Sequence, residues 1–139
     1  MYTIKLIKSA DKETINKVKN WEEQEWGPEG VTSTDNPFAI AGAYFDDMLV
    51  GMTVLASRDL EPRPLLTPWI ASVYVQPRHR GKGLAKRLMT CLEQEAIKEG
   101  FKTLWLYTED TALYSSQGWI YVETLMFNDV NIHIMKKDI

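Results

Sequence analysis

The chain has 139 residues, of which 45% are hydrophobic and 25% are charged, and its formal net charge is −3 at pH 7. This length suffices for one domain with its own hydrophobic core, over residues 1–139, and the composition excludes a disordered or fibrous chain. The net negative charge offers no general attraction to nucleic acid, which we therefore do not expect as a partner.

Cysteine usage and hydropathy indicate the compartment. Cys91 is the only cysteine, so the sequence allows no intrachain disulfide and no CxxC metal or redox motif. The N-terminal residues alternate between polar and apolar types and lack the apolar stretch of a signal peptide. No run of about 18 apolar residues is present that would span a bilayer. We therefore expect a cytoplasmic protein with no membrane partner.

The first part of the chain predicts a strand, a helix and a hairpin. Alternation predicts a strand over residues 2–8, and an amphipathic stretch predicts a helix over residues 11–25. Turn residues without periodicity predict a loop over residues 27–37. Two apolar runs with an acidic turn between them predict an antiparallel hairpin, residues 38–45 and 48–56.

The second part predicts a central strand followed by a long helix. A nearly continuous run of apolar and β-branched residues, 69–75, is typical of a strand covered on both faces. Leucine and alanine at four-residue spacing then predict a helix that begins after Gly83 and ends at Gly100. A strand, a short helix and two final strands follow, at residues 103–108, 111–117, 120–127 and 130–136.

A basic, glycine-containing motif, Arg80-Gly81-Lys82-Gly83, lies where the central strand turns into the long helix. The first turn of a helix has backbone N–H groups without intrahelical partners and carries partial positive charge, so it binds phosphate. Glycines let a pyrophosphate approach this backbone, and Arg80 and Lys82 add positive charge. The spacing fits neither the Walker loop nor the dinucleotide-binding fingerprint. The motif predicts a site for a diphosphate-bearing cofactor.

The segment Arg80-Gly81-Lys82-Gly83-Leu84-Ala85 matches the signature Gln/Arg-x-x-Gly-x-Gly/Ala of the GNAT superfamily of acetyl-CoA-dependent N-acetyltransferases. The preceding Val73-x-Val75-x-Pro77 also matches, so the chain resembles this family over most of its length. The resemblance implies an α/β (α+β) fold with a mixed, mostly antiparallel twisted sheet of six or seven strands and helices on both faces. The cofactor cleft is expected where the strands at 69–75 and 103–108 diverge.

The resemblance also implies acetyl-CoA as the cosubstrate and no metal. In this family the loop binds the CoA pyrophosphate through backbone N–H groups, and the preceding strand pairs with the pantetheine arm like an added β-strand. A backbone N–H near Tyr74 or Val75 is the expected donor to the oxyanion of the reacting thioester. The expected cofactor-binding residues are Val73, Tyr74, Val75, Arg80, Gly81, Lys82, Gly83, Leu84 and Ala85.

A second segment, Ala112-Leu113-Tyr114-Ser115-Ser116-Gln117-Gly118-Trp119, resembles the family's Ala-x-x-Tyr-x-x-x-Gly-Phe pattern with a shorter spacing and with Trp119 in place of phenylalanine. The resemblance implies that Tyr114 protonates the leaving thiolate of CoA. A phenol with a pKa near 10 is a suitable donor to a thiolate with a pKa near 8.5 when the two are in contact. The alternative is that Tyr114 only packs on the sheet. Trp119 is expected to be a core residue.

The general base is not evident, because the segment Thr67–Val73 contains no glutamate, which some family members have there. Acidic residues of the first helix and the loop after it either attract a cationic acceptor or form a solvated acidic face, and we favour the second: Glu22, Glu23, Glu25, Glu29 and Asp35. His79 is expected at the surface beside the phosphate loop, and His133 is expected to have a structural role on the last strand.

These features predict transfer of an acetyl group from acetyl-CoA to a primary amine of a small molecule or peptide, by direct attack in a ternary complex. The alternatives are a non-catalytic acyl-CoA-binding module, which the missing glutamate favours, and a toxin-like or tRNA-directed acetyltransferase, which the acidic composition disfavours. The sequence leaves open the identity of the amine, the use of other acyl groups, and the oligomeric state, with a homodimer among the alternatives.

Overall fold

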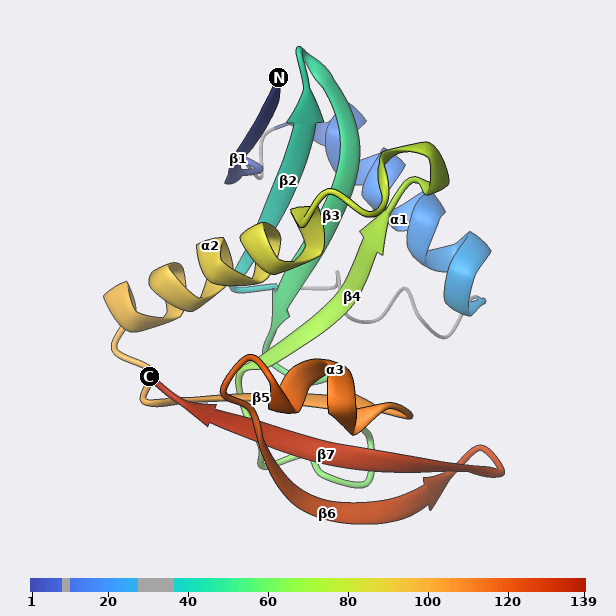
Figure 1. The fold of residues 1–139 in the computed structure, drawn as a ribbon, viewed down its shortest axis with the longest axis vertical. Helices are drawn as coiled ribbons and strands as arrows, with labels where there is room; N and C mark the ends of the chain where they lie inside the picture. The colour runs from blue at the N-terminus through green and yellow to red at the C-terminus, as the bar shows by residue number, and fades with distance from the viewer. Residues whose placement is uncertain (9–10, 28–36) are drawn as a thin grey trace.

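The structure is a computed structural model that describes residues 1–8, 11–27 and 37–139. Its strands form one seven-stranded sheet in the order β1-β2-β3-β4-β5-β7-β6 (Figure 1). All neighbours are antiparallel except β4 and β5, which are parallel. The mixed, mostly antiparallel sheet is therefore confirmed. The strands are β1 (Tyr2–Leu6), β2 (Ala39–Phe45), β3 (Met48–Ala56), β4 (Trp69–Val75), β5 (Thr103–Thr108), β6 (Ile120–Phe127) and β7 (Val130–Asp138).

Of the helices that the structure describes, two are each preceded by an aspartate that caps the first turn. The carboxylate of Asp11 accepts a hydrogen bond from the Thr14 N–H (3.1 Å) at the start of α1 (Lys12–Trp26). Asp110 caps α3 (Thr111–Ser115) in the same way. The long helix α2 (Leu84–Lys98) begins directly after Gly83, which has no side chain with which to cap it. Most of the expected loop over residues 27–37 lies outside the described residues.

Helices cover both faces of the sheet, with α1 and α2 on opposite sides (Figure 1). Residues of α2 pack with β2, β3 and β5 in a cluster that we call the α2 cluster; its members include Val50, Leu55, Leu88, Leu92, Leu104 and Trp119. Residues of α1 pack on the other face in the α1 cluster, whose members include Val18, Trp21, Met52, Val54 and Trp69. Trp119 is thus a core residue, as expected.

The sheet splits between its two parallel strands. β4 and β5, both fully described, pair at one position, Trp69 with Trp105, and then diverge (Figure 1). Near the split β4 carries a bulge. Ala71 pairs with Val54 of β3, and Tyr74 pairs with Met52. The two β4 residues between Ala71 and Tyr74 therefore lie opposite the single β3 residue between Met52 and Val54. The expected divergence of these strands is confirmed.

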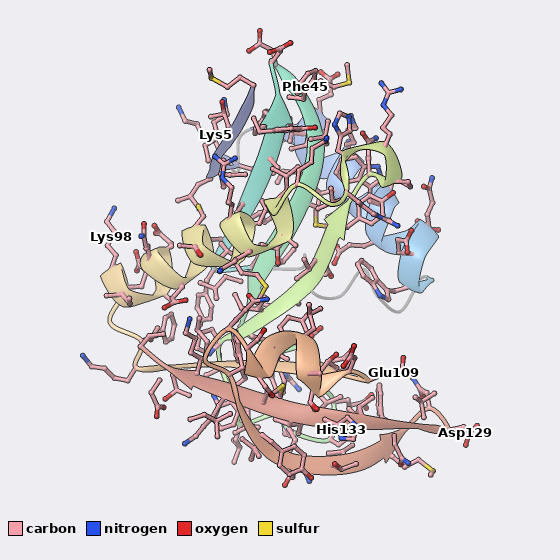
Figure 2. All side chains as sticks on the ribbon, viewed as in Figure 1. Lys5, Phe45, Lys98, Glu109, Asp129 and His133 are labelled. Atoms are coloured by element: carbon pink, nitrogen blue, oxygen red, sulfur yellow. The ribbon has the colours of Figure 1, made fainter. Side chains whose placement is uncertain are left out.

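Helix α2 packs on the sheet through the buried face that follows the glycine turn. Leu92 is fully buried in the α2 cluster, whereas Ile97 on the same helix is 51% exposed. Figure 2 shows Lys98, one residue further on, pointing away from the sheet.

We predict that Leu92→Ala lowers the free energy of unfolding by about 2–5 kcal/mol, because it removes buried apolar contacts and leaves a cavity. The matched variant Ile97→Ala should change it by less than about 1 kcal/mol, since that side chain is largely solvated. Urea denaturation followed by circular dichroism measures both. Equal losses in the two variants would contradict the observed burial.

Candidate active site

The phosphate-binding motif forms a tight connection between β4 and α2. A 3-10 turn, Pro77–His79, follows the strand, and the Arg80 Nε donates a hydrogen bond back to the Val75 carbonyl (2.7 Å). Gly81 and Gly83 have φ angles of 76° and 75°, a left-handed conformation that glycine adopts without strain. Neither glycine has a heavy atom within 4 Å of the position that a Cβ would occupy. The turn therefore leaves open space beside the N-terminus of α2.

A cavity of about 310 Å³ lies at this turn. It brings together eight of the nine expected cofactor-binding residues. Lys82 is the exception, being exposed and outside the lining. The full lining is Glu25, Trp26, Val73, Tyr74, Val75, His79, Arg80, Gly81, Gly83, Leu84 and Ala85.

The end of β4 presents backbone polar groups to the gap in the sheet. The Gln76 N–H donates to the Val50 carbonyl of β3 (2.8 Å). Because backbone groups alternate in direction along an antiparallel strand, those of Val75 point away from β3, toward the side from which β5 has diverged. The Arg80 contact with the Val75 carbonyl agrees with this direction. The Val75 N–H therefore faces the place where an extended ligand would lie.

The bulge in β4 is held by two side chains from other elements. Ser72 has a φ of 55°, and its hydroxyl donates a hydrogen bond to the Glu22 carboxylate of α1. Thr53 of β3 is fully buried and donates its hydroxyl to the Ala71 carbonyl (3.0 Å). Since Ser72 is not glycine, this left-handed conformation requires support from such contacts.

The expectation of a solvated acidic face is wrong for Glu22. Its exposed fraction is 0%, because it lies on the apolar side of α1 with Val18 and Trp21. Glu23 and Glu25 are exposed as expected, whereas Glu29 and Asp35 lie outside the described residues. The sequence contains a signal for this burial, because Glu22 stands at the helical spacing of the other buried residues of α1.

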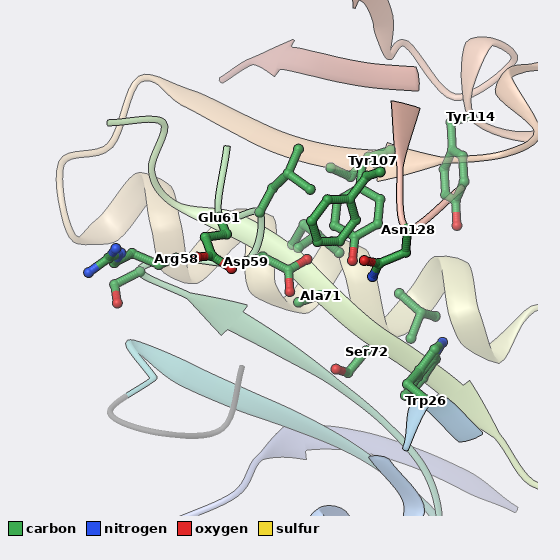
Figure 3. Close-up of a pocket in the computed structure, with 15 residues that line it drawn as sticks. Trp26, Arg58, Asp59, Glu61, Ala71, Ser72, Tyr107, Tyr114 and Asn128 are labelled. Carbon is green, nitrogen blue, oxygen red and sulfur yellow. The ribbon is translucent and has the colours of Figure 1, made fainter. Parts of the chain in front are cut away.

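A larger cavity of about 990 Å³ opens between the diverging strands (Figure 3). It shares Trp26 and Val73 with the smaller cavity, so the two adjoin at the β4 bulge. Tyr114 lines it and also packs against the α2 cluster. The other lining residues come from the segment after β3, from β4 and β5, and from the β6–β7 turn: Ser57, Arg58, Asp59, Leu60, Glu61, Ile70, Ala71, Ser72, Leu106, Tyr107, Phe127 and Asn128.

Burial in this cavity raises the pKa of three ionisable groups. The pKa of Tyr114 is raised by burial and, less, by the negative charge of Asp110. Burial, followed by the charge of Glu22, raises the pKa of the Asp59 carboxyl to about 7. Burial, followed by the charge of Asp59, raises the pKa of Tyr107 to about 12. Both phenols are therefore protonated at neutral pH, while Asp59 titrates there.

Asp59 was not predicted to be a site residue. It belongs to a polar segment between two strands, and nothing in its sequence neighbourhood distinguishes it from a surface aspartate. Its position in the cavity results from the packing of α1, β4 and β5 around it, which no local pattern encodes.

The expectation that His79 is a surface residue is wrong. Its exposed fraction is 8%, and its Nδ1 lies 2.8 Å from the hydroxyl of Tyr2 on β1. The centroid of the His79 ring lies 5.7 Å from that of the Tyr2 ring and 5.6 Å from that of the Phe45 ring. His133 lies on β7 (Figure 2), where its Nδ1 is 2.7 Å from the Thr124 hydroxyl of β6. This cross-strand contact agrees with the expected structural role.

Helix length and the placement of possible metal ligands are two further features of the described residues. None of the helices there is both long enough and apolar enough to cross a membrane. Within the same ranges, no group of three or more histidine, cysteine, aspartate or glutamate residues is arranged to hold a metal ion.

The model of the acetyltransferase (GNAT) family matches residues 3–119. Because this match covers most of the 139 residues, the chain belongs to the acetyltransferase (GNAT) family. The resemblance inferred from the sequence is thereby confirmed. No curated protein matches the chain.

Solved structures share the fold at low sequence identity. Aminoglycoside 6'-acetyltransferase type Ii has a TM-score of 0.78 and 17% identity, with 98% of this chain and 96% of that chain covered. An aminoglycoside 6'-N-acetyltransferase complexed with coenzyme A has a TM-score of 0.77 and 16% identity, with the same coverage. The ribosomal-protein-S18-alanine N-acetyltransferase from Escherichia coli has a TM-score of 0.74 and 18% identity, with 100% and 94% covered.

We predict that Gly83→Asp weakens acetyl-CoA binding at least about tenfold, because a carboxylate at the N-terminus of α2 would repel a pyrophosphate. The control is Gly83→Asn, which has nearly the same size and the same tolerance for a left-handed backbone but no charge. Isothermal titration calorimetry measures both affinities. If both variants bind equally well, charge at this position does not matter and the pyrophosphate lies elsewhere.

Proposed function

We propose that this protein transfers an acetyl group from acetyl-CoA to a primary amine of a small molecule or peptide. The observation that carries the proposal is the meeting of two cavities at Val73 and Trp26. One contains the glycine turn that suits a pyrophosphate, and the other contains a buried phenol. Two substrates bound in adjoining cavities meet at the β4 bulge, which is the arrangement that direct transfer requires.

The residues of the smaller cavity would hold the cosubstrate. The N-terminus of α2 offers backbone N–H groups and positive charge to its phosphates. The Val75 N–H, which faces the gap between β4 and β5, would donate to an amide oxygen of the pantetheine arm. The bound thioester supplies the activated acetyl group. The CoA-containing neighbour supports this use of the cleft.

Tyr114 is proposed as the general acid. Its raised pKa keeps the phenol protonated at neutral pH, the state in which it donates a proton to a leaving thiolate. Its ring packs against the α2 cluster, so its position is fixed by the same contacts that hold the helix.

Direct transfer is favoured over a covalent enzyme intermediate. Cys91 lies on a flank of α2, outside the lining of both cavities. Burial, followed by the negative charge of Glu95, raises the pKa of its thiol, so the nucleophilic thiolate is disfavoured. We further propose that residues 1–139 act as one domain, and that a protein using acetyl-CoA with a reduced cysteine works in the cytoplasm.

A thiol-release assay with acetyl-CoA and a panel of primary amines tests the proposal. Saturating acetyl-CoA should also raise the melting temperature, since a ligand that binds only the folded state stabilises it. Binding without thiol release for any amine would make the chain a non-catalytic acyl-CoA-binding module. The absence of both effects would contradict the use of acetyl-CoA.

We predict that Tyr114→Phe lowers turnover by about 10²- to 10⁴-fold, the usual contribution of a positioned general acid. The affinity for acetyl-CoA should change little, because the hydroxyl acts mainly in the transition state. Steady-state kinetics measure kcat, with Tyr121→Phe as the control, since Tyr121 lies on β6 outside the cavity and is 53% exposed. If Tyr114→Phe keeps a near-normal kcat, Tyr114 is not the general acid, and its only role is to pack against the α2 cluster.

A further inference from the structure

The carboxylate of Asp59 is the ionisable group of the larger cavity that the proposed function does not use. Figure 3 shows it pointing into the cavity, close to Tyr107 and Asn128. Its side chain makes no hydrogen bond or ion pair with any of the residues that the structure describes. Asp59 is half-buried, and its carboxylate oxygens are not sealed inside the protein, so a cationic ligand in the cavity can reach them.

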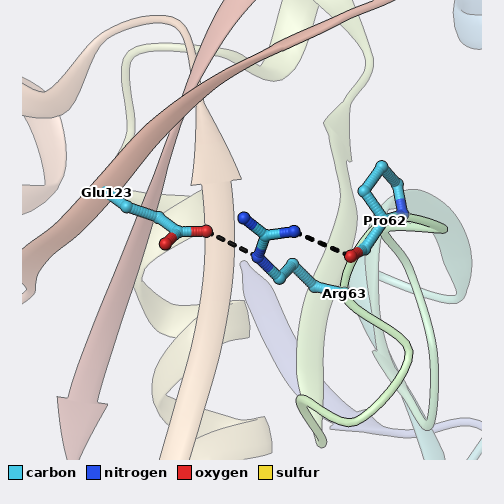
Figure 4. A network of polar contacts seen from close by, with 3 residues as sticks. All are labelled: Pro62, Arg63 and Glu123. Carbon is cyan, nitrogen blue, oxygen red and sulfur yellow. Dashed lines mark hydrogen bonds and ion pairs between the residues drawn. The ribbon is translucent and has the colours of Figure 1, made fainter.

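The segment that carries Asp59 is held in place at several points. The next residue, Leu60, is only 2% exposed and packs in the α1 cluster. Arg63 donates one hydrogen bond to the Glu123 carboxylate of β6 (2.6 Å) and another to the Pro62 carbonyl (2.8 Å), as Figure 4 shows. The Trp69 indole N–H donates to the Leu66 carbonyl (2.6 Å). The carboxylate is therefore positioned by the fold.

The charged and titratable groups around Asp59 come from α1, β5, its own segment and α3, which contributes the Tyr114 phenol to the same cavity. Glu22 of α1 acts on it electrostatically from behind the bulge, and Tyr107 faces it from β5. Arg58 and Glu61 belong to its own segment, and Figure 3 shows the Arg58 side chain directed away from the cavity. The β6–β7 turn contributes only the neutral side chains Phe127 and Asn128. Among the residues that the structure describes, the groups acting on Asp59 are mainly acidic, and Arg58, the cationic residue of the cavity lining, is directed away from it.

Aromatic side chains complete this environment. Trp26, Tyr107 and Phe127 line the same cavity. Aromatic faces attract alkylammonium groups and also pack against methylene chains. Negative charge together with aromatic walls suits an aliphatic amine that carries more than one positive charge, and it disfavours an acceptor with its own carboxylate, such as a free amino acid.

We infer that Asp59 is a catalytic residue that binds an aliphatic di- or polyamine acceptor as its cation and accepts a proton from the reacting nitrogen, with Glu22 as a positioning residue behind it. This inference rests on the proposed function and specifies its acceptor.

The proton and electron balance is simple. Asp59 takes one proton from the ammonium group, and the freed lone pair forms the N–C bond to the acetyl carbon. The C–S bond then breaks, and the sulfur keeps its electron pair. Tyr114 gives its proton to the sulfur and recovers one from the nitrogen of the new amide. Asp59 releases its proton to solvent, so the products are the N-acetylated amine, CoA with a free thiol, and one proton.

The first test is the pH dependence of kcat/KM with spermidine as the acceptor, because kcat/KM reports the ionisations of the free enzyme. A base acts in its deprotonated form, so kcat/KM should fall as the pH decreases through about 7. Asp59→Asn should lower kcat by about 10²- to 10⁴-fold and abolish this acidic limb. Glu22→Gln removes the negative charge that helps to raise the Asp59 pKa, so the limb should move to lower pH. A limb that persists in Asp59→Asn would overturn the inference.

The second test is calorimetric binding of spermidine at fixed pH. Asp59→Asn should weaken it at least about tenfold while leaving acetyl-CoA affinity unchanged, because a single ionic contact in an enclosed site is lost. The control is Asp129→Asn, which removes one negative charge at the exposed β6–β7 turn (Figure 2) and should bind as the wild type does. Equal binding by Asp59→Asn and wild type would contradict the assigned role.

The same data separate the inference from the proposed function. Efficient acetylation of diamines by Asp59→Asn would leave the acetyltransferase activity standing and refute the role of Asp59. Efficient acetylation of amino acids but not of diamines by the wild type would do the same. If no amine is acetylated by the wild type although acetyl-CoA binds, the proposed function and the inference both fail.

Discussion

The divergence of β4 from β5 is the constraint on which the rest of the structure depends. The two strands pair at one position and then separate, which leaves one side of β4 without a strand partner. Such an exposed edge costs free energy unless something covers it. The protein holds the split open with the bulge at Ser72, which the buried carboxylate of Glu22 supports from α1. Both cavities, the glycine turn and the candidate acid lie along the gap that results.

Burial in this gap acts in the same direction on three ionisable side chains. It raises the pKa of Asp59, Tyr107 and Tyr114, because a low-dielectric environment disfavours the charged form of an acid. For a phenol this preserves the proton at neutral pH. For Asp59 it makes the carboxyl weak enough to hold a proton during the reaction and strong enough to lose it afterwards. A bound ammonium group would lower the pKa of Asp59 again, which couples acceptor binding to the release of a proton.

The sequence predicted those parts of the structure that depend on neighbouring residues. The strand β4 and the glycines at positions 81 and 83 form a contiguous segment, so their order and their conformational needs can be recognised directly. The positions of Glu22, Asp59 and His79 depend instead on contacts between distant elements. His79 is buried because Tyr2, 77 residues away, covers it. Glu22 reaches the bulge across 50 residues of chain. The helical spacing of Glu22 indicates that it is buried, but no local pattern reports which distant residues these three side chains contact.

The overall charge of −3 conceals a separation of charge along the cleft. Basic residues accompany the N-terminal end of α2, namely Arg80, Lys82, Lys86 and Arg87, whereas Glu22 and Asp59 lie around the larger cavity. In the proposed reaction, the two ends of the cleft would attract ligands of opposite sign, a polyanionic cosubstrate and a cationic acceptor. In the inferred mechanism, Asp59 does the work of a glutamate on β4. A carboxylate supplied from the segment after β3, backed by one from α1, leaves the bulge residue small and the reacting groups room to meet.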